Sequence, residues 1–96
     1  MATKTKLTQW DAADYLDTAE DVALYLDAAL AENDPALVAA ALGDIARSKG
    51  MSAIARETGL SRESLYRSLS PNGNPELGTI LKVAESLGIR FRALAR

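Results

Sequence analysis

The chain has 96 residues, which is enough for one small folded domain and too few for two independent ones. It contains no cysteine and no histidine, so disulfides, thiolate chemistry and zinc sites built on those ligands are excluded. The formal net charge is only −2, but residues 1–44 carry nine acids and two lysines, net −7, whereas residues 45–96 carry nine bases and four acids, net +5.

Two helices are expected in the acidic first third of the chain. A short helix should span residues 11–17, with Asp11 as its N-cap. Thr18-Ala-Glu-Asp21 has the pattern of a capping box, with Asp in place of the usual Glu or Gln, and predicts a second helix that ends near Asn33. Apolar residues of this second helix recur at helical spacing along one stripe: Val22, Tyr25, Leu26, Ala29 and Leu30.

A third helix is predicted between Asp34 and Gly50. Aspartate followed by proline is a strong start signal, because the aspartate can cap the helix and Pro35 suits its first position. Gly50 is a strong stop signal, since glycine readily adopts the conformation that ends a helix. The expected inward face consists of Leu37, Val38, Ala41, Leu42 and Ile45.

Residues 51–69 carry the most informative pattern of the chain. Two short helices are predicted over residues 52–58 and 62–69, with Ser52 and Ser61 as their N-caps. Ala55 is the small residue expected where the two backbones approach, and Gly59 tolerates positive φ in the turn. The residues expected to face inward are Ile54, Leu60, Leu65 and Leu69. This is the pattern of a helix-turn-helix, which makes double-stranded DNA the leading ligand.

An ordinary helical hairpin is the alternative for the same residues. In that interpretation Gly59 only ends the first helix, and the arginines of the second helix form a solvated face.

One more helix is predicted after the turn-rich loop of residues 70–74. Asn74 and Pro75 repeat the cap-plus-proline start signal, and Gly88 is the stop signal. The expected buried face of this helix consists of Leu77, Ile80, Leu81, Ala84 and Leu87. Residues 89–94 alternate apolar and basic at first, which suits a short extended segment.

Residues 34–91 resemble the Cro/Xre-type helix-turn-helix domains. The series Asp-Ala-Ala-Asp-Tyr-Leu (11–16), Leu-Gly-Asp-Ile-Ala-Arg (42–47), Leu-Ser-Arg-Glu-Ser-Leu-Tyr (60–66) and Leu-Ser-Pro-Asn-Gly-Asn-Pro (69–75) looks more narrowly like the addiction-module antidote proteins of the HigA-like kind. The resemblance implies an all-α bundle of five or six short helices with a lambda-repressor-like DNA-binding domain. It also implies a type II antitoxin that binds a small basic RelE/ParE-like toxin and represses its own operon.

The predicted DNA-binding residues lie on the second helix of the motif and around it. Arg62 or Arg67 could contact guanine with two hydrogen bonds, and Glu63 could accept one from cytosine, although each could equally contact phosphate or cap the helix. Cro-type repressors often carry glutamines there, so the preferred base sequence stays open. The full set is Ser52, Arg56, Ser61, Arg62, Glu63, Tyr66, Arg67, Ser70, Asn72 and Asn74.

The acidic first part of the chain is the candidate surface for a toxin. Aromatic residues within an acidic rim suit a protein interface, so the predicted anchors are Trp10, Tyr15, Leu16 and Tyr25. Closure of a small core by these side chains is the alternative. We therefore expect one structural unit with an N-terminal helical extension, residues 1–33, and a DNA-binding domain, residues 34–96.

A homodimer is expected, because a repressor with two-fold symmetry matches a near-palindromic operator. The candidate dimer surface is the last helix with Phe91 and Leu94. Neither an enzyme nor a cofactor is expected, since no nucleophile with a base, metal cluster or phosphate loop is recognisable. The absence of an apolar leader or a long apolar stretch favours a cytoplasmic location. A stand-alone or phage-type repressor without a toxin remains the alternative function.

Overall fold

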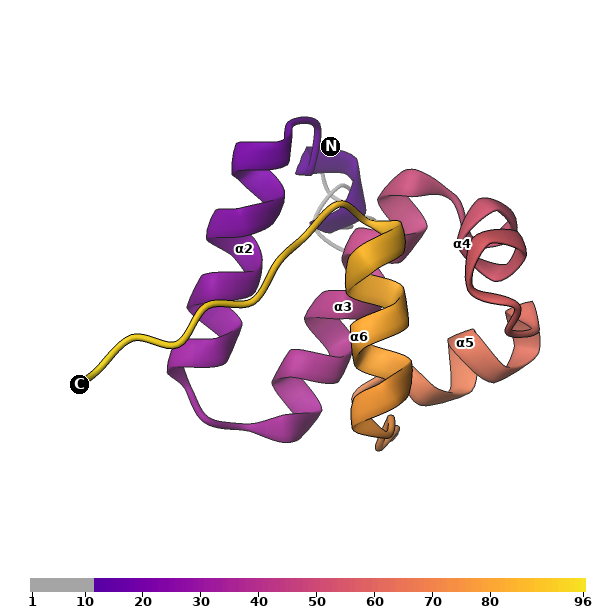
Figure 1. Ribbon diagram of the computed structural model, residues 1–96. Helices are drawn as coiled ribbons and strands as arrows, with labels where there is room; N and C mark the ends of the chain where they lie inside the picture. Colours follow the sequence, from indigo (N-terminus) through magenta and orange to yellow (C-terminus); the bar gives the residue numbers. More distant parts are fainter. Residues whose placement is uncertain (1–11) are drawn as a thin grey trace, which may run out of the picture.

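Helix α3 (Pro35–Lys49) is the element around which the rest of the fold is arranged. The computed structural model describes residues 12–96. In chain order these residues form the 3-10 helix η1 (Ala12–Tyr15) and helices α2 (Ala19–Ala31), α3, α4 (Met51–Thr58), α5 (Arg62–Ser68) and α6 (Leu77–Ser86). Helix α3 contacts η1, α2, α4 and α5, and α4 packs on α6 (Figure 1). No strand occurs within the described residues, so the all-α prediction is confirmed.

The helix ends follow the capping signals of the sequence at several positions. The Thr18 hydroxyl accepts from the Asp21 amide at 3.0 Å, and the Asp21 carboxylate accepts from the Thr18 amide at 3.3 Å, which completes the capping box. Asp34 caps α3 by accepting from the Ala36 amide at 3.0 Å. Gly50 ends α3 with a φ of 113°, a value that favours glycine.

Three predicted helix starts are wrong or only partly right. Helix α4 begins one residue earlier than expected, directly after Gly50, so Ser52 lies inside its first turn and caps nothing. Helix α6 begins at Leu77 after Glu76 rather than at Pro75, and its start has no side-chain cap. The predicted helix over residues 11–17 is a single 3-10 turn, and its expected cap, Asp11, lies outside the described residues.

The hydrophobic core forms one cluster to which helices α2 to α6 contribute. Helix α3 is buried on more sides than a single stripe, because its neighbours surround it, and Ala39 and Ala46 are as buried as Leu42. Leu37, expected in the core, is instead 42% exposed. The largest fully buried side chains are Leu42, Ile45, Ile54, Leu65 and Val83.

Only one side of α6 faces this core, and it agrees in part with the side that the sequence predicted: Ile80, Ala84 and Leu87 are confirmed, whereas Leu77 and Leu81 are wrong and Val83 was not predicted. Val83 and Ala84 are buried, and Ile80 packs against the cluster. Leu77 and Leu81, one helical turn apart, are exposed to 69% and 51%. Apolar residues occur around most of this helix, so their spacing alone allows more than one inward face.

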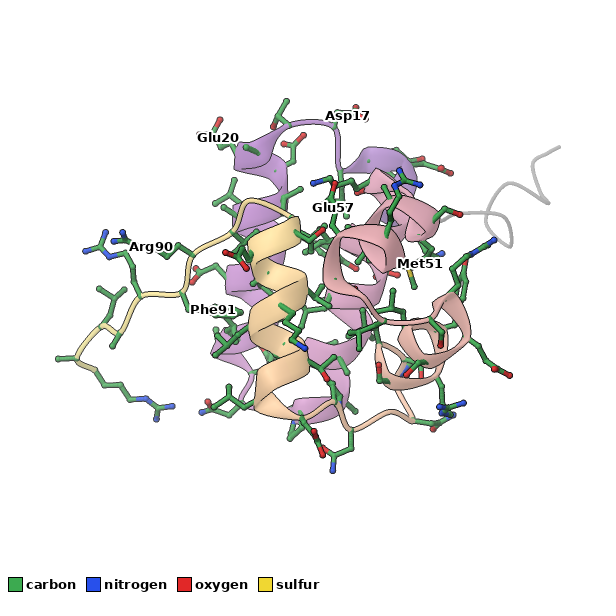
Figure 2. The ribbon with its side chains drawn as sticks, turned by 45° about the vertical axis from the view of Figure 1, so that its right-hand side comes forward. Asp17, Glu20, Met51, Glu57, Arg90 and Phe91 are labelled. Carbon is green, nitrogen blue, oxygen red and sulfur yellow. The ribbon has the colours of Figure 1, made fainter. Side chains whose placement is uncertain are left out.

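The C-terminal segment, residues 89–96, forms neither helix nor strand and runs extended from the end of α6 across α2 (Figure 1). The Ile89 amide donates to the Ala84 carbonyl at 2.9 Å, and Ile89 and Phe91 pack against the core. In Figure 2, Phe91 is directed back toward the helices and Arg90 away from them. The expected extended segment at this end of the chain is therefore present.

Gly43 allows a close backbone approach between two helices that are distant in sequence. A Cβ atom at this position would lie 2.1 Å from the carbonyl oxygen of Leu69, the residue that ends α5. Real atoms never come that close, so any side chain at residue 43 would push α3 and the end of α5 apart. Ala55 was predicted at a different approach, that between α4 and α5, and the approach of α5 to α3 at Gly43 was not predicted.

We expect Gly43→Ala to lower the free energy of unfolding by about 1–3 kcal/mol, as overpacking of a core does. Gly78→Ala is the matched control, because Gly78 is also helical but has nothing within 4 Å of its hypothetical Cβ. Alanine there should stabilise by up to about 1 kcal/mol. Urea denaturation followed by circular dichroism measures both, and equal effects of the two substitutions would contradict the close approach.

Candidate nucleic-acid interface

Helices α4 and α5 are joined by a turn of three residues, 59–61, and cross steeply (Figure 1). Gly59 has a φ of 77°, the left-handed conformation that the turn was expected to need. Ile54, Leu65 and Leu69 are buried between these two helices and the rest of the core. The predicted inward face of the two helices is thereby confirmed for those three residues, and Leu60 packs beside them half-buried.

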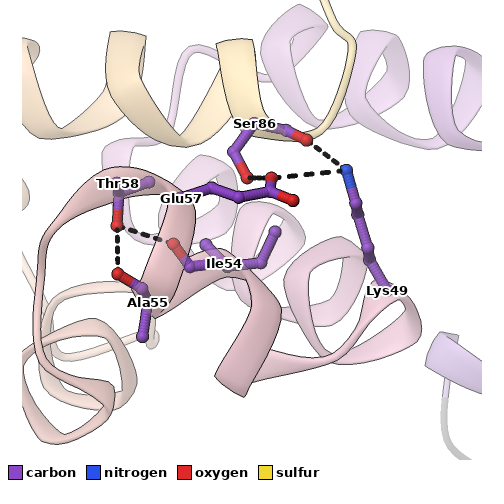
Figure 3. A network of polar contacts seen from close by, with 6 residues as sticks. All are labelled: Lys49, Ile54, Ala55, Glu57, Thr58 and Ser86. Atoms are coloured by element: carbon purple, nitrogen blue, oxygen red, sulfur yellow. Dashed lines mark hydrogen bonds and ion pairs between the residues drawn. The ribbon is translucent and has the colours of Figure 1, made fainter.

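Local hydrogen bonds hold the turn in place. The Thr58 hydroxyl donates to the Ile54 carbonyl at 2.7 Å (Figure 3). The same hydroxyl accepts from the Leu60 amide at 3.3 Å. The Ser61 hydroxyl accepts from the Ser64 amide at 3.0 Å, which confirms Ser61 as the N-cap of α5. The orientation of α5 relative to α4 is therefore fixed by buried side chains below and by these bonds at the turn.

The ten predicted DNA-binding residues all lie at the surface. Nine are exposed and Ser70 is half-buried, with its hydroxyl donating to the Arg67 carbonyl at 3.0 Å. Within the set, the structure brings Arg62 and Tyr66 together, because the guanidinium carbon of Arg62 lies 5.9 Å from the centre of the Tyr66 ring. Arg62, Tyr66 and Arg67 thus give α5 an exposed face of two cations and one aromatic ring.

A polar network joins the end of α3 to α4 and α6 (Figure 3). The Ser86 hydroxyl donates to the Glu57 carboxylate at 2.5 Å, and the Lys49 ammonium lies 3.8 Å from the same carboxylate oxygen. Lys49 also donates to the Ser86 carbonyl. The Ser86 hydrogen bond first, and the Lys49 charge second, hold the pKa of Glu57 below its usual value.

Sequence reasoning missed this network because its members are far apart in the chain. Lys49 and Ser86 are 37 residues apart, and Ser86 and Glu57 are 29 residues apart. The only sequence signal was a cation in the last turn of α3, which the helix dipole explains by itself.

The predicted toxin-contacting residues differ in how far their side chains are exposed to solvent. Tyr15 is 60% exposed, whereas Leu16 and Tyr25 are half-buried and pack against the core. The Tyr25 hydroxyl donates to the Asp44 carboxylate at 2.5 Å, and Arg47 bonds the other oxygen of that carboxylate. Trp10 lies outside the described residues.

Two other kinds of site have no candidate in the part of the chain that the structure describes. No group of three or more acidic side chains is placed so that it could hold a metal ion. No helix within residues 12–96 is both long enough and apolar enough to cross a membrane.

Comparison with known proteins gives two matches. A family model described as "Probable addiction module antidote protein" matches residues 6–95. A protein of Haemophilus influenzae, described as uncharacterized, is 45% identical over 87 residues, which cover 91% of this chain and 90% of that protein. No solved structure matches the chain.

The Glu57 network makes a prediction about acid stability. Because the pKa of Glu57 is lowered in the folded chain, its ionised form stabilises the fold at neutral pH, and that contribution is lost as the pH falls through the lowered pKa. Glu57→Gln should therefore lose stability at about pH 7 and show a shallower decline toward about pH 3.

Urea denaturation at a series of pH values measures this dependence. Glu85→Gln is the control, since Glu85 is an exposed carboxylate on α6 with no ion pair among the described residues. Identical pH profiles for wild type and Glu57→Gln would contradict the role given to the network.

Proposed function

The chain belongs to the family of probable addiction module antidote proteins, and on that premise we propose that it is the antitoxin of a type II toxin–antitoxin module. The observation that carries the proposal is the family match, which covers residues 6–95. An antidote implies a toxin as its protein partner and a regulatory rather than an enzymatic role. In the proposal, the protein acts in the cytoplasm, neutralises a RelE/ParE-like toxin by direct contact and represses its own operon.

The DNA-binding part of the proposal treats α4 and α5 as a helix-turn-helix of the Cro/Xre and lambda-repressor type. Helix α5 would enter the major groove, with Arg62 or Arg67 bonding guanine through two donors and Glu63 accepting from cytosine. Support comes from the exposed Arg62, Tyr66 and Arg67 on α5, and from the net charge of +5 on residues 45–96. Each good two-bond contact to a base contributes about 1–3 kcal/mol of discrimination.

Phosphate contacts would come from the residues that flank α5. Ser52 lies in the first turn of α4, where unpaired backbone amides favour an anion, and Arg56 follows one turn later. Asn72 and Asn74 are exposed on the loop after α5, and the Ser61 hydroxyl can still donate its proton to a phosphate oxygen. A homodimer would place two α5 helices on half-sites one or more helical turns apart, roughly 34 Å for each turn.

The toxin-binding part of the proposal rests on the acidic half of the chain. Residues 12–44 contain eight carboxylates and no lysine or arginine, so their surface complements a basic partner. Tyr15 is the exposed aromatic residue of this region, whereas the burial of Leu16 and Tyr25 gives those two side chains a part in the core as well. We therefore place the toxin on η1 and the first turn of α2, which carries Glu20 and Asp21, with Tyr15 as its first anchor.

The experiment that tests the proposal measures two binding events with the full chain. The first is a salt-titrated binding assay to the DNA directly upstream of its own gene, against a scrambled duplex of equal length. The second is co-purification with the protein encoded beside it on the same transcript, together with relief of that protein's toxicity. Operator binding without a toxin partner would favour the stand-alone repressor, and failure of both would overturn the proposal.

Arg67→Ala tests the DNA-binding face. Specific binding should weaken by about 1–3 kcal/mol if Arg67 reads a base, or the salt dependence should fall by about one unit if Arg67 contacts phosphate. Lys82→Ala is the control, because Lys82 is an exposed cation on α6 rather than on α5. Unchanged affinity and salt slope would remove Arg67 from the interface.

Tyr15→Ala and Tyr66→Ala test whether the two proposed surfaces are separate. Both tyrosines are exposed, to 60% and 46%, so neither substitution should unfold the chain. Loss of Tyr15 should weaken toxin binding by about 1–3 kcal/mol and leave operator affinity unchanged, and loss of Tyr66 should do the reverse. Isothermal titration with each partner measures both effects, and a Tyr15→Ala variant with full toxin affinity would exclude this anchor.

A further inference from the structure

The extended C-terminal segment crosses α2 (Figure 1). A groove lies between this segment and the helix. We call it the α2–tail groove. On the α2 side it is lined by Ala23, Leu24, Leu26, Asp27 and Leu30, and on the other side by Ile89, Arg90, Phe91, Arg92 and Leu94.

The rims of this groove carry exposed apolar side chains. Three of the eight large apolar side chains that are exposed in residues 12–96 lie here, and two of them, Leu24 and Leu94, are exposed to 65% and 77%. The third, Leu30, lies six residues further along α2, and Phe91 between the two sides of the groove packs against the core. A concave apolar patch of this kind marks an interaction surface more often than a solvated one.

The charges around the groove narrow the choice of partner. Asp27 lies on the α2 side, and Arg90 and Arg92 lie on the tail side. A nucleic acid would meet the acidic α2, and a basic protein would meet the two arginines. A second copy of this chain, turned by a two-fold axis, would instead set its arginines against Asp27 and its Asp27 against the arginines.

We propose that the α2–tail groove is the surface through which two copies of this chain associate. Leu24 and Leu94 of one copy cover the groove of the other, and Asp27 pairs with Arg92 across the interface in both directions. The inference rests on the proposed function only in that an operator-binding antitoxin is expected to be a dimer; the groove itself is a feature of the fold.

The position of the groove is compatible with both proposed binding surfaces. Helices α2 and α5 lie on opposite sides of the molecule, with α3 and α6 between them (Figure 1). Association through α2 therefore leaves the exposed face of α5 open to DNA. Tyr25, on the side of α2 that packs toward Asp44 of α3, also stays outside this contact.

The exposed pair Leu77 and Leu81 on α6 is the competing surface for a dimer. These two leucines belong to one helix. Neither of them lines the hollow between α4 and α6, the hollow beside the start of α3, or the α2–tail groove. The α2–tail groove combines concavity, two facing segments and charges of both signs, so it is the better candidate.

The first test compares substitutions of exposed leucines in the full chain. Leu24→Asp and Leu94→Asp should each raise the dimer dissociation constant roughly tenfold or more, because a carboxylate would be buried in an apolar contact. Leu77→Asp is the matched control, since Leu77 is equally exposed at 69% but lies on α6. Sedimentation equilibrium measures association, and circular dichroism checks that each variant is folded.

The outcomes of this test are distinct. A wild-type dimer that Leu24→Asp and Leu94→Asp dissociate and Leu77→Asp does not would support the proposal. A monomeric wild type, or a dimer that Leu77→Asp alone dissociates, would overturn it. Because Leu94 lies in the tail and is exposed, its substitution tests the interface even if Leu24→Asp were to perturb α2.

The second test asks whether Asp27 and Arg92 pair between copies rather than within one. Asp27→Arg alone and Arg92→Asp alone should each weaken self-association, because like charges would then face each other across both ends of the interface. A mixture of the two variants should form a heterodimer, since opposite charges are restored only between unlike chains. Failure of the mixture to associate better than either variant alone would contradict the pairing.

These tests separate the further inference from the proposed function. Operator binding and toxin capture by a monomeric wild type would remove the α2–tail interface and leave the antitoxin proposal standing. A dimer that dissociates as expected but binds neither DNA nor toxin would confirm the interface and remove the proposed function.

Discussion

The backbone contact between Gly43 of α3 and the carbonyl of Leu69 is the constraint on which the arrangement of the helices depends. Because these atoms touch without a side chain between them, the end of α5 lies directly on the central helix. That contact buries Leu65 and Leu69 and turns the opposite side of α5, with Arg62 and Arg67, toward solvent. The position of the candidate DNA-binding face is thus set by the absence of one methyl group.

Charge and burial divide the surface into regions with different possible partners. Helix α2 shows this most clearly, since Tyr25 packs toward α3 on one side and Leu24 faces the tail on the other. The carboxylates of η1 and α2 lie on the opposite side of the molecule from the arginines of α5, whereas Asp44 of α3 lies near Tyr66 of α5. A chain of 96 residues can therefore present an acidic surface, a basic surface and an apolar groove on different helices, with Asp27 shared between the acidic surface and the groove.

Local patterns in the sequence predicted most of the helices, but the sequence did not predict contacts between residues that are far apart in the chain. The capping box at Thr18, the Asp34 cap and the left-handed turn at Gly59 depend on neighbouring residues, and all three are present. Which side of α6 faces inward depends on what packs against it, so Leu77 was assigned to the core but is exposed. The hydrogen bond between Ser86 and Glu57 forms only when α4 and α6 pack together, so no local sequence pattern predicts it.

Helices α2 to α6 share a single hydrophobic cluster, in which Leu26 and Ala29 of α2 pack with Ile54 of α4 and Leu65 of α5. A chain with one such cluster is expected to unfold in one cooperative transition rather than in parts. A protease that cleaves the described residues must then wait for the whole fold to open, at a rate governed by the global equilibrium. Proteolytic degradation would thus destroy the acidic surface and the basic surface at the same time.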